Sequence, residues 1–295
     1  MSNAAAELLG LEGKAALVTG GGAGIGRSIV ETYVKLGMRV AVADIDPAKV
    51  ADLRASLGPD HIVAQADAAD AADMGRVMAE IEHRFGKLHV LVNNVGDHLA
   101  SKKSFEDSTE AEWDGLYRAN LRHMFTTTKL AIPLLKKGAQ DGQAGGASII
   151  NNSTIEAFRG IPLLVAYGAF KAGITGFTQS LAVELGQFGI RVNAIAPEST
   201  NTAQILGTTK VPPENRAHLA TWFPIGRFGE PGDCAGAAVY LASENLSGWV
   251  SGTTIHIDGG VLASGSWLRM VQGGFTHLPI IEVDGYTQRP HAQQK

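Results

Sequence analysis

The chain has 295 residues, of which 45% are hydrophobic and 18% are charged, and its formal net charge is −4. This is the composition of a globular protein with enough apolar residues for a large core. The lysines and arginines form no basic stripe, which argues against a nucleic-acid partner. Cys234 has no second cysteine with which to form a disulfide.

The sequence also shows no metal, export or membrane signal. The nine histidines include no pair at the H-E-x-x-H spacing, so we expect no metal site. Residues 1–10 have no basic region and too short an apolar run for a signal peptide, and no later stretch approaches the roughly 18 apolar residues of a membrane span. We expect a cytoplasmic protein that has no membrane partner.

Short apolar runs alternate with longer amphipathic segments from residue 14 to about residue 258. Alternation of this kind predicts an α/β fold, a Rossmann-like doubly wound parallel sheet of about seven strands with helices on both faces. Several runs are apolar almost throughout, as expected for parallel strands that helices cover on both sides. The predicted strands are 14–19, 39–44, 62–66, 88–93, 147–152, 190–196 and 253–257, and the predicted helices include 25–37, 73–86 and 172–189.

Three segments depart from this alternation. Residues 136–146 are polar and glycine-rich, which indicates a surface loop, and residues 199–232 form a long, proline-broken stretch after a strand. Loops at the carboxyl ends of such strands form the ligand crevice, so we expect 199–232 to be a lid. The C-terminal extension, 261–295, is too apolar in its first half for free disorder, and residues 287–295 are expected to fray. We expect this extension to cover the active site or a neighbouring subunit.

A glycine-rich turn, "TGGGAGIG" at 19–26, joins the first strand to the first helix. Gly20, Gly24 and Gly26, with Ile25 between the last two, stand where a chain must turn tightly and approach a diphosphate. The free N–H groups and the positive dipole end of the following helix would bind this anion. The alternative is a merely flexible turn.

Asp44 closes the second strand. An acid at this place accepts hydrogen bonds from the adenosine ribose hydroxyls and repels a 2′-phosphate. Since no Arg or Lys lies in the glycine turn or directly after Asp44, the sequence favours NAD over NADP. The alternative is a solvated acid before the turn "DPAKV".

Five motifs in order resemble the short-chain dehydrogenases/reductases in their smaller, single-domain form. The resemblance implies one dinucleotide-binding catalytic domain over 1–295, with a core at about 11–260, and commonly a homotetramer. The motifs are T-G-x-x-x-G-x-G as "TGGGAGIG", N-N-A-G as "NNVG" at 93–96, the asparagine of "RANL" at Asn120, Y-x-x-x-K as "YGAFK" at 167–171, and D-G-G at 258–260.

The resemblance also assigns roles to single residues. Asp67 corresponds to the acid that contacts the adenine ring, although a plain surface acid is an alternative. Asn93 corresponds to the residue that steadies the central sheet, and Gly96 to the one beside the cofactor ribose. Asn120 corresponds to the active-site asparagine that bends its helix and holds a water for proton relay; asparagine is otherwise a weak helix former.

Two neighbouring hydroxyls, Ser153 and Thr154, are candidates for the catalytic hydroxyl. The family pattern G-x-I-I-N-x-S-S has its catalytic serine last, and both this match and the usual spacing before the tyrosine point to Thr154. An extra residue in the loop would give the role to Ser153 instead. A threonine hydroxyl has the same donor and acceptor capacity as serine.

Tyr167 and Lys171 lie four positions apart and resemble the family's proton-transfer pair. The positive charges of Lys171 and of the oxidised nicotinamide are expected to favour the phenolate, which takes the alcohol proton or returns it in reduction. Lys171 would also bind the nicotinamide ribose, and Thr154 would hold the substrate oxygen. The alternative is an ordinary surface pair on a helix.

After the sixth strand the family has P-G-x-[IV]-x-T, and "PESTNT" keeps Pro197 and Thr202. Glu198 replaces the glycine beside the pocket, and Thr200 replaces the aliphatic residue. We expect Thr200 and Thr202 to bind the carboxamide.

The positions that line the substrate site in this family are apolar or aromatic here, with a few polar residues. They favour a hydrophobic cyclic or aryl secondary alcohol or a diol over a sugar phosphate, unless the aromatic residues belong to the core. One alternative is a 3-ketoacyl-thioester reductase, but such enzymes normally prefer NADPH, and Asp44 argues against this cofactor. Another alternative is a non-catalytic dinucleotide-binding regulator, and the presence of Tyr167 and Lys171 argues against it. The positions are Asp97, His98, Glu156, Phe158, Leu163, Trp222 and Phe223.

Overall fold

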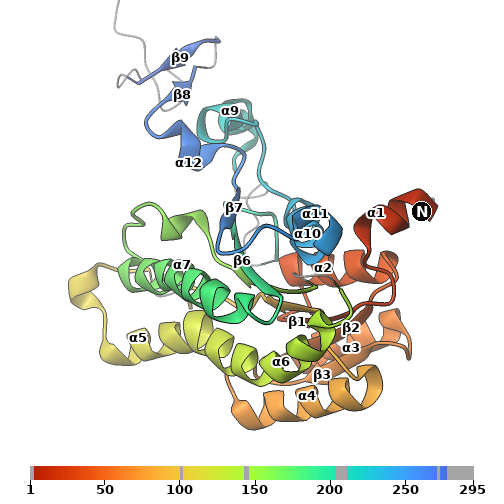
Figure 1. Cartoon of the computed structure of the whole chain (residues 1–295). Coiled ribbons are helices and arrows are strands. Elements are labelled where there is room, and N and C mark those ends of the chain that lie inside the picture. Colours follow the sequence, from red (N-terminus) through yellow and green to blue (C-terminus); the bar gives the residue numbers. More distant parts are fainter. Residues whose placement is uncertain (1–2, 100–101, 143–145, 204–210, 271–272, 278–295) are drawn as a thin grey trace, which may run out of the picture.

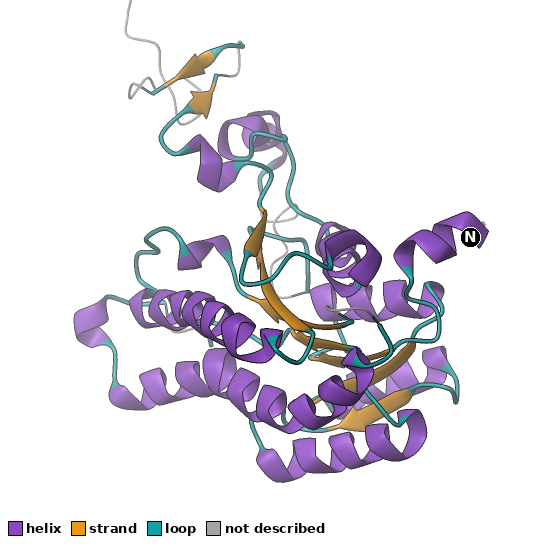
Figure 2. Ribbon diagram, viewed as in Figure 1, coloured by secondary structure: helices purple, strands orange, loops and turns teal. Residues whose placement is uncertain are grey.

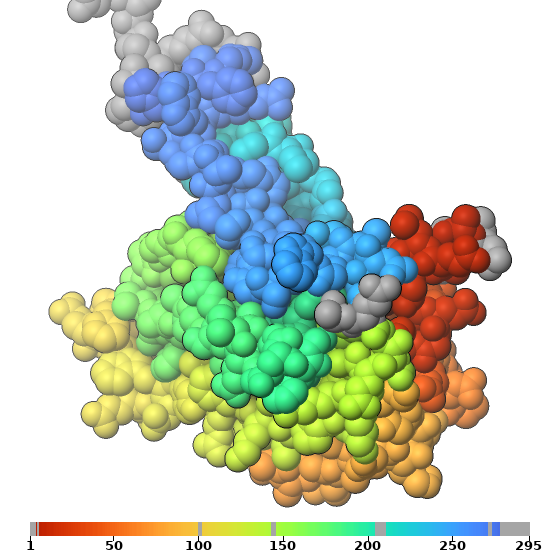
Figure 3. All heavy atoms as spheres, viewed as in Figure 1, coloured from red at the N-terminus to blue at the C-terminus, as the bar shows by residue number. Residues whose placement is uncertain are grey.

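A computed structural model describes residues 3–99, 102–142, 146–203, 211–270 and 273–277. A parallel sheet with helices on both faces forms the body (Figures 1 and 2). A smaller part, which we call the arm, projects from this body (Figure 3). It carries α9 (Leu219–Trp222), α12 (Val261–Ser264), β8 (Leu268–Arg269) and β9 (Phe275–Thr276).

The seven strands of the main sheet all pair in parallel, in the order β3-β2-β1-β4-β5-β6-β7. The chain starts in the middle, moves to one edge and crosses back to place β4 beside β1. Ligands of such sheets bind where the order reverses, outside the carboxyl ends of the strands. The predicted fold class is therefore confirmed. The strands are β1 (Ala15–Thr19), β2 (Arg39–Asp44), β3 (Ile62–Gln65), β4 (Val90–Asn93), β5 (Ala147–Asn152), β6 (Ile190–Pro197) and β7 (Thr254–Ile257).

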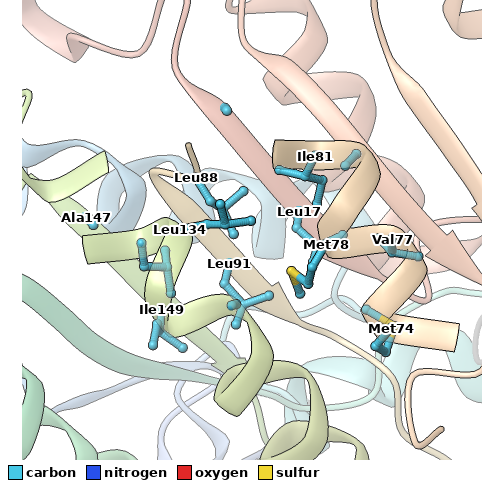
Figure 4. Packing of buried hydrophobic residues seen from close by; sticks show 14 of the residues in the cluster. Leu17, Met74, Val77, Met78, Ile81, Leu88, Leu91, Leu134, Ala147 and Ile149 are labelled. Atoms are coloured by element: carbon cyan, nitrogen blue, oxygen red, sulfur yellow. The ribbon is translucent and has the colours of Figure 1, made fainter. Parts of the chain in front are cut away.

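The helices cover the two faces of the sheet as separate groups. Successive strand residues point to opposite faces, so that Leu17 belongs to one buried cluster and Val18 to the other. The first cluster packs on α4 (Ala71–Phe85), α6 (His123–Ala139) and α7 (Val165–Gly186); Figure 4 shows Met78 and Ile81 of α4 beside Leu17. The second packs on α2 (Gly24–Lys35), α3 (Pro47–Leu57) and α10 (Pro231–Ala242). The remaining helical segments are α1 (Asn3–Leu9), α5 (Glu110–Tyr117), α11 (Glu244–Ser247), the π turn η2 (Arg118–Arg122) and the 3-10 turns η1 (Phe105–Asp107), η3 (Ile155–Ala157) and η4 (Pro213–His218).

Local signals account for several helix ends. The side chains of Asp46 and Asp70 accept hydrogen bonds from the first backbone N–H groups of α3 and α4. α4 ends at Gly86, whose φ of 75° lies in the left-handed region. In the described part of the chain, no helix combines the length and the apolar character that a bilayer crossing needs.

Two sequence predictions are wrong at the level of elements. The stretch 136–146, predicted to be a loop, begins as a helix, because α6 continues to Ala139. Gly138, which suggested a loop, is a packing glycine: a Cβ there would lie 2.0 Å from the carbonyl oxygen of Leu88. The helix predicted at 172–189 begins already at Val165 and therefore includes Tyr167 and Lys171. Residues 204–210 of the expected lid and 278–295 of the extension lie outside the described residues.

Candidate active site

The glycines of the turn between β1 and α2 have little room for a side chain or a backbone that disfavours one. A Cβ on Gly26 would lie 2.3 Å from the carbonyl oxygen of Gly20, and Gly20 and Gly24 have φ values of 63° and 55°. Ala23 precedes α2 and cannot cap it with a side-chain acceptor, so the first N–H groups of this helix are available to an anion. These features fit the diphosphate of a dinucleotide.

Asp44 connects the end of β2 to this turn. Its Oδ2 accepts a hydrogen bond from the Gly22 N–H at 2.8 Å, and its Oδ1 accepts one from Asp46 at 3.0 Å. The sequence analysis missed Lys49, which also lines the cleft beside Asp44 and whose Nζ lies 3.5 Å from Asp46 Oδ2. Its position in the sequence, in the first turn of the helix that follows Asp44, could have indicated that it lies near this carboxylate.

A cleft of about 900 Å³ lies at the carboxyl ends of the strands. It brings together most of the residues that the sequence predicted for cofactor and chemistry, although they are far apart in the chain. Those that line it are Gly20, Gly24, Ile25, Asp44, Asp67, Gly96, Asp97, His98, Ser153, Thr154, Tyr167, Lys171, Pro197, Thr200 and Thr202.

Asp67 has partners on both carboxylate oxygens. Oδ1 accepts from the Ala69 N–H at 2.8 Å, and Oδ2 pairs with the guanidinium of Arg118. Arg118 also lines the cleft, and the sequence analysis did not single it out. This end of the cleft therefore carries a paired acid and base, not an isolated surface acid.

Asn93 and Asn120 lie behind the cleft. The Asn93 side chain is fully buried and donates to Asn151 Oδ1 at 2.9 Å and to Thr128 Oγ1 at 3.0 Å, which joins β4, β5 and α6. Asn120 lies in the π turn η2, and a π turn changes the direction of a helix. Its Nδ2 donates to the carbonyl oxygen of Asp97 at 2.7 Å, and its Oδ1 accepts from the Asp97 N–H at 3.2 Å.

Ser153 and Thr154 have different partners. Ser153 is buried, and its Oγ donates to the backbone oxygen of Lys171 at 3.3 Å. Thr154 is partly exposed; its Oγ1 donates to the carbonyl oxygen of Pro197 at 3.2 Å and accepts from the Glu156 N–H at 3.4 Å.

Lys171 is buried in α7, with its Nζ 3.3 Å from the carbonyl oxygen of Asn152 and 5.8 Å from the centre of the Tyr167 ring. Burial lowers the pKa of Lys171 to about 8, and the negative charge of Asp97 partly opposes this. A Cβ on Gly96 would lie 2.8 Å from Nζ, so a larger residue at this position would displace the end of the lysine side chain.

The phenol of Tyr167 has a pKa above its ordinary value. Burial is the main cause, and the carboxylates of Glu156 and Asp97 raise the pKa further. The surrounding protein groups therefore favour the neutral phenol. The expectation that Lys171 and the oxidised nicotinamide together favour the phenolate stays a prediction.

Glu198, which departs from the family pattern, belongs to an ion-pair group that includes a residue missed from the sequence. The Arg159 Nη2 atom lies 2.7 Å from Glu156 Oε1 and 2.5 Å from Glu198 Oε2. Arg159 thus joins η3, next to Thr154, to the end of β6. Glu198, which stands where the family has a glycine, could have indicated from the sequence that a basic residue lies nearby.

Thr200 and Thr202 follow β6. Thr200 is buried, and its Oγ1 donates to the carbonyl oxygen of Glu198 at 2.9 Å. Thr202 lies over the glycine turn, since a Cβ on Gly24 would come within 3.1 Å of its Cγ2.

Several residues predicted for the substrate site do not line the cleft. Phe158 makes an edge contact with the His256 ring, with centroids 4.7 Å apart. Leu163 lies with Tyr167 at a separate pocket of about 20 Å³. Trp222, which is 53% exposed, belongs to the arm, and Phe223 follows it and packs on Phe228.

The parallel sheet and the glycine-rich turn at its carboxyl edge define an α/β protein of the dinucleotide-binding type. Residues 20–262 match a family model described as enoyl-(acyl carrier protein) reductase. The chain belongs to the short-chain dehydrogenase/reductase family, whose members oxidise alcohols or reduce ketones with a nicotinamide dinucleotide.

Two relatives show how broad the similarity is. 2-(S)-Hydroxypropyl-CoM dehydrogenase 3 of Xanthobacter autotrophicus is 34% identical over 259 residues, which cover 86% of this chain and 98% of that protein. A 3-oxoacyl-[acyl-carrier-protein] reductase of Staphylococcus aureus is 36% identical over 256 residues, which cover 84% and 98%.

Two crystal structures are similar to the whole core. That of levodione reductase has a TM-score of 0.75 and 29% identity, covering 85% of this chain and 98% of the other. That of 3-ketoacyl-(acyl-carrier-protein) reductase from Brucella melitensis complexed with NADH has a TM-score of 0.75 and 30% identity, covering 85% and 99%.

Proposed function

We propose that the chain is an NAD-dependent dehydrogenase that transfers a hydride between NAD(H) and a secondary alcohol or ketone. The observation that carries this proposal is that Thr154, Tyr167 and Lys171 line the same cleft as the glycine turn and Asp44. The preferred substrate is a hydrophobic cyclic or aryl secondary alcohol or a diol. The unit is one catalytic domain with a core at about 11–260.

The bound cofactor supplies or accepts the hydride, and the protein positions the reactants and moves one proton. In reduction, the neutral phenol of Tyr167 gives its proton to the carbonyl oxygen of the ketone. In oxidation it must first lose that proton, which its raised pKa opposes. Thr154 holds the substrate oxygen, Lys171 binds the nicotinamide ribose, and Asn120 keeps the Asp97 backbone in place through its two hydrogen bonds.

The preference for NAD rests on Asp44. Its carboxylate is 7% exposed, lines the cleft and is held by the Gly22 N–H, so it cannot turn away from a 2′-phosphate without losing this bond. Lys49 is the opposing charge at this end, and its neighbour Asp46 compensates it. At the nicotinamide end, we assign the carboxamide to Thr200 and Thr202 beside Pro197.

A 3-ketoacyl-thioester reductase is the second candidate, favoured by the match to the Staphylococcus aureus relative. The cofactor alone does not separate the two candidates, because the similar Brucella melitensis reductase is complexed with NADH. The substrate panel must therefore include a thioester.

The test measures absorbance of the reduced nicotinamide with NAD(H) and NADP(H). The panel holds cyclic, aryl and aliphatic secondary alcohols, vicinal diols, the matching ketones and an acetoacetyl thioester. We expect turnover of cyclic or aryl compounds with NAD(H), and none by Tyr167→Phe. Tight NAD binding without turnover of any compound would indicate a regulator. Light scattering tests the further proposal of a homotetramer.

A further inference from the structure

Asn152, the last residue of β5, takes part in a chain of amide groups that leads to the glycine turn. Its Nδ2 donates to Asn94 Oδ1 at 3.0 Å. The Nδ2 of Asn94 in turn donates to the carbonyl oxygens of Thr19, at 3.2 Å, and Gly20, at 3.0 Å. Asn152 is thus two hydrogen bonds away from the backbone of the diphosphate-binding turn.

These partners determine how both amides are oriented. Carbonyl oxygens only accept, so the atom of Asn94 that faces Thr19 and Gly20 must be the nitrogen. Asn94 then presents its oxygen to Asn152, and this oxygen needs a donor. Asn152 therefore turns its nitrogen toward Asn94, and its remaining side-chain atom is an acceptor, Oδ1.

The Oδ1 atom of Asn152 is buried and has no hydrogen-bond partner among the described residues. Asn152 is 8% exposed and lines the cleft. Buried polar atoms in folded proteins are nearly always paired, so this acceptor calls for a donor, which in a cleft is supplied by a ligand or by an ordered water.

The backbone of Asn152 shows where in the cleft the Oδ1 acceptor lies. Its backbone oxygen accepts the hydrogen bond of the Lys171 ammonium at 3.3 Å. One residue thus contacts the catalytic lysine through its backbone and the glycine-turn network through its side chain. Asn152 therefore lies between the glycine turn and the side chain of Lys171.

We propose that Asn152 Oδ1 accepts a hydrogen bond from the nicotinamide half of the bound dinucleotide and orients this half for hydride transfer. The inference rests on the proposed function. The phosphates and the nicotinamide ring offer no donor, so the donor is a ribose hydroxyl or the carboxamide N–H. Asn152 is then a cofactor-binding residue that neither the motifs nor the expected contacts had indicated.

The test replaces Asn152 by Leu, which is similar in size and has no hydrogen-bonding group. Dissociation constants are measured by fluorescence for NADH and by calorimetry for ADP-ribose and ADP. ADP contains neither candidate donor, ADP-ribose contains the ribose hydroxyls, and NADH contains both. We expect NADH to bind about tenfold more weakly, the usual effect of one lost hydrogen bond, with ADP unchanged.

The ADP-ribose result then separates the two donors. An equal loss with ADP-ribose assigns the ribose hydroxyl, and an unchanged affinity assigns the carboxamide. An equal loss with ADP means that Asn152 acts only through the glycine turn, which overturns the inference. Unchanged NADH affinity also overturns it and leaves the proposed function intact, whereas a native chain that binds neither NADH nor NADPH defeats both.

Asn193→Leu is the matched control. Asn193 is a buried amide of β6 outside the cleft; it donates to the Val250 carbonyl oxygen at 2.8 Å and accepts from the Thr253 N–H at 3.2 Å. We expect it to lower the melting temperature without changing the NADH affinity. If Asn152→Leu does not fold, a crystal structure of the native chain with NADH decides: Oδ1 within about 3.2 Å of a ribose hydroxyl or the carboxamide nitrogen supports the inference, and a larger distance overturns it.

Discussion

Ser153 and Thr154 are adjacent in the chain, yet their hydroxyls donate to different elements: Ser153 to the backbone of Lys171 in α7, and Thr154 to the carbonyl oxygen of Pro197 at the end of β6. The serine is thus part of the packing of α7. The threonine is partly exposed and borders the ion-pair group of Arg159.

Thr154→Val keeps the side-chain shape and removes the hydroxyl. We expect a loss of turnover of roughly a hundredfold or more, about 2.7 kcal/mol of transition-state stabilisation, with almost unchanged NAD affinity. Thr154→Ser should remain active, and Ser153→Ala should cost far less. Steady-state kinetics with cofactor titrations measure all three. A nearly inactive Ser153→Ala beside a normal Thr154→Val would reverse the assignment.

Asp44→Ala should weaken NAD and improve NADP, because it removes both the ribose acceptor and the repulsion of a 2′-phosphate. Since Asp44 also holds the Gly22 N–H, the melting temperature should fall as well. The measurement is kcat/KM for both cofactors. Lys49→Ala is the companion variant, and if it weakens NADP in the Asp44→Ala background, Lys49 is the base that contacts the 2′-phosphate. A native chain that already prefers NADP would show the assignment of Asp44 to be wrong.

The direction of the reaction should depend on pH. The raised pKa of Tyr167 keeps the proton that ketone reduction needs, so reduction should proceed well at neutral pH and decline only in the alkaline range. Oxidation needs the phenolate and should rise as the pH rises. Rate profiles in both directions with the same substrate pair check this. Oxidation that is already independent of pH near neutrality, with chemistry rate-limiting, would contradict it.

Lys171→Met should abolish activity and raise the melting temperature at pH 7. Burial lowers the pKa of Lys171 from 10.5 to about 8, so the unfolded chain binds this proton more tightly than the folded chain does. Between about pH 8 and 10.5 the folded chain loses this proton before the unfolded chain does, so the free energy of unfolding of the native protein rises with pH. The difference in melting temperature between Lys171→Met and the native protein should therefore shrink over that range. Thermal unfolding at several pH values measures it. Lys129→Met, at an exposed lysine of α6, serves as the control and should change little.

Arg159→Met should leave Glu156 and Glu198 with no basic partner between them. Their negative charge would then act more strongly on Tyr167, and the pH profile of oxidation should move up by roughly half a unit. Arg227→Met, which breaks an exposed pair with Asp233, is the matched control. An unchanged profile in Arg159→Met would mean that these carboxylates do not influence the phenol.

Local pattern was sufficient for the alternation of strands and helices and for the order of the motifs. A short apolar run such as 39–44 is typical of a buried strand, and in "TGGGAGIG" the backbone at Gly20 and Gly24 has positive φ values that favour glycine. These features depend on neighbours within a few positions, which the sequence displays directly. The register of the family motifs likewise indicated Thr154, Tyr167 and Lys171 without any structure.

Tertiary structure alone decided which side chains meet. Arg159 contacts Glu198 from 39 positions away, Arg118 contacts Asp67 from 51, and Asn152 contacts Asn94 from 58. Gly138 could be a loop residue or a packing residue until Leu88 was placed against it. Burial, Glu156 and Asp97 together raise the pKa of Tyr167, and its spacing to Lys171 in the chain does not reveal this. Such contacts and pKa shifts arise from folding distant segments into one cleft, so a pattern of residues along the chain does not contain them.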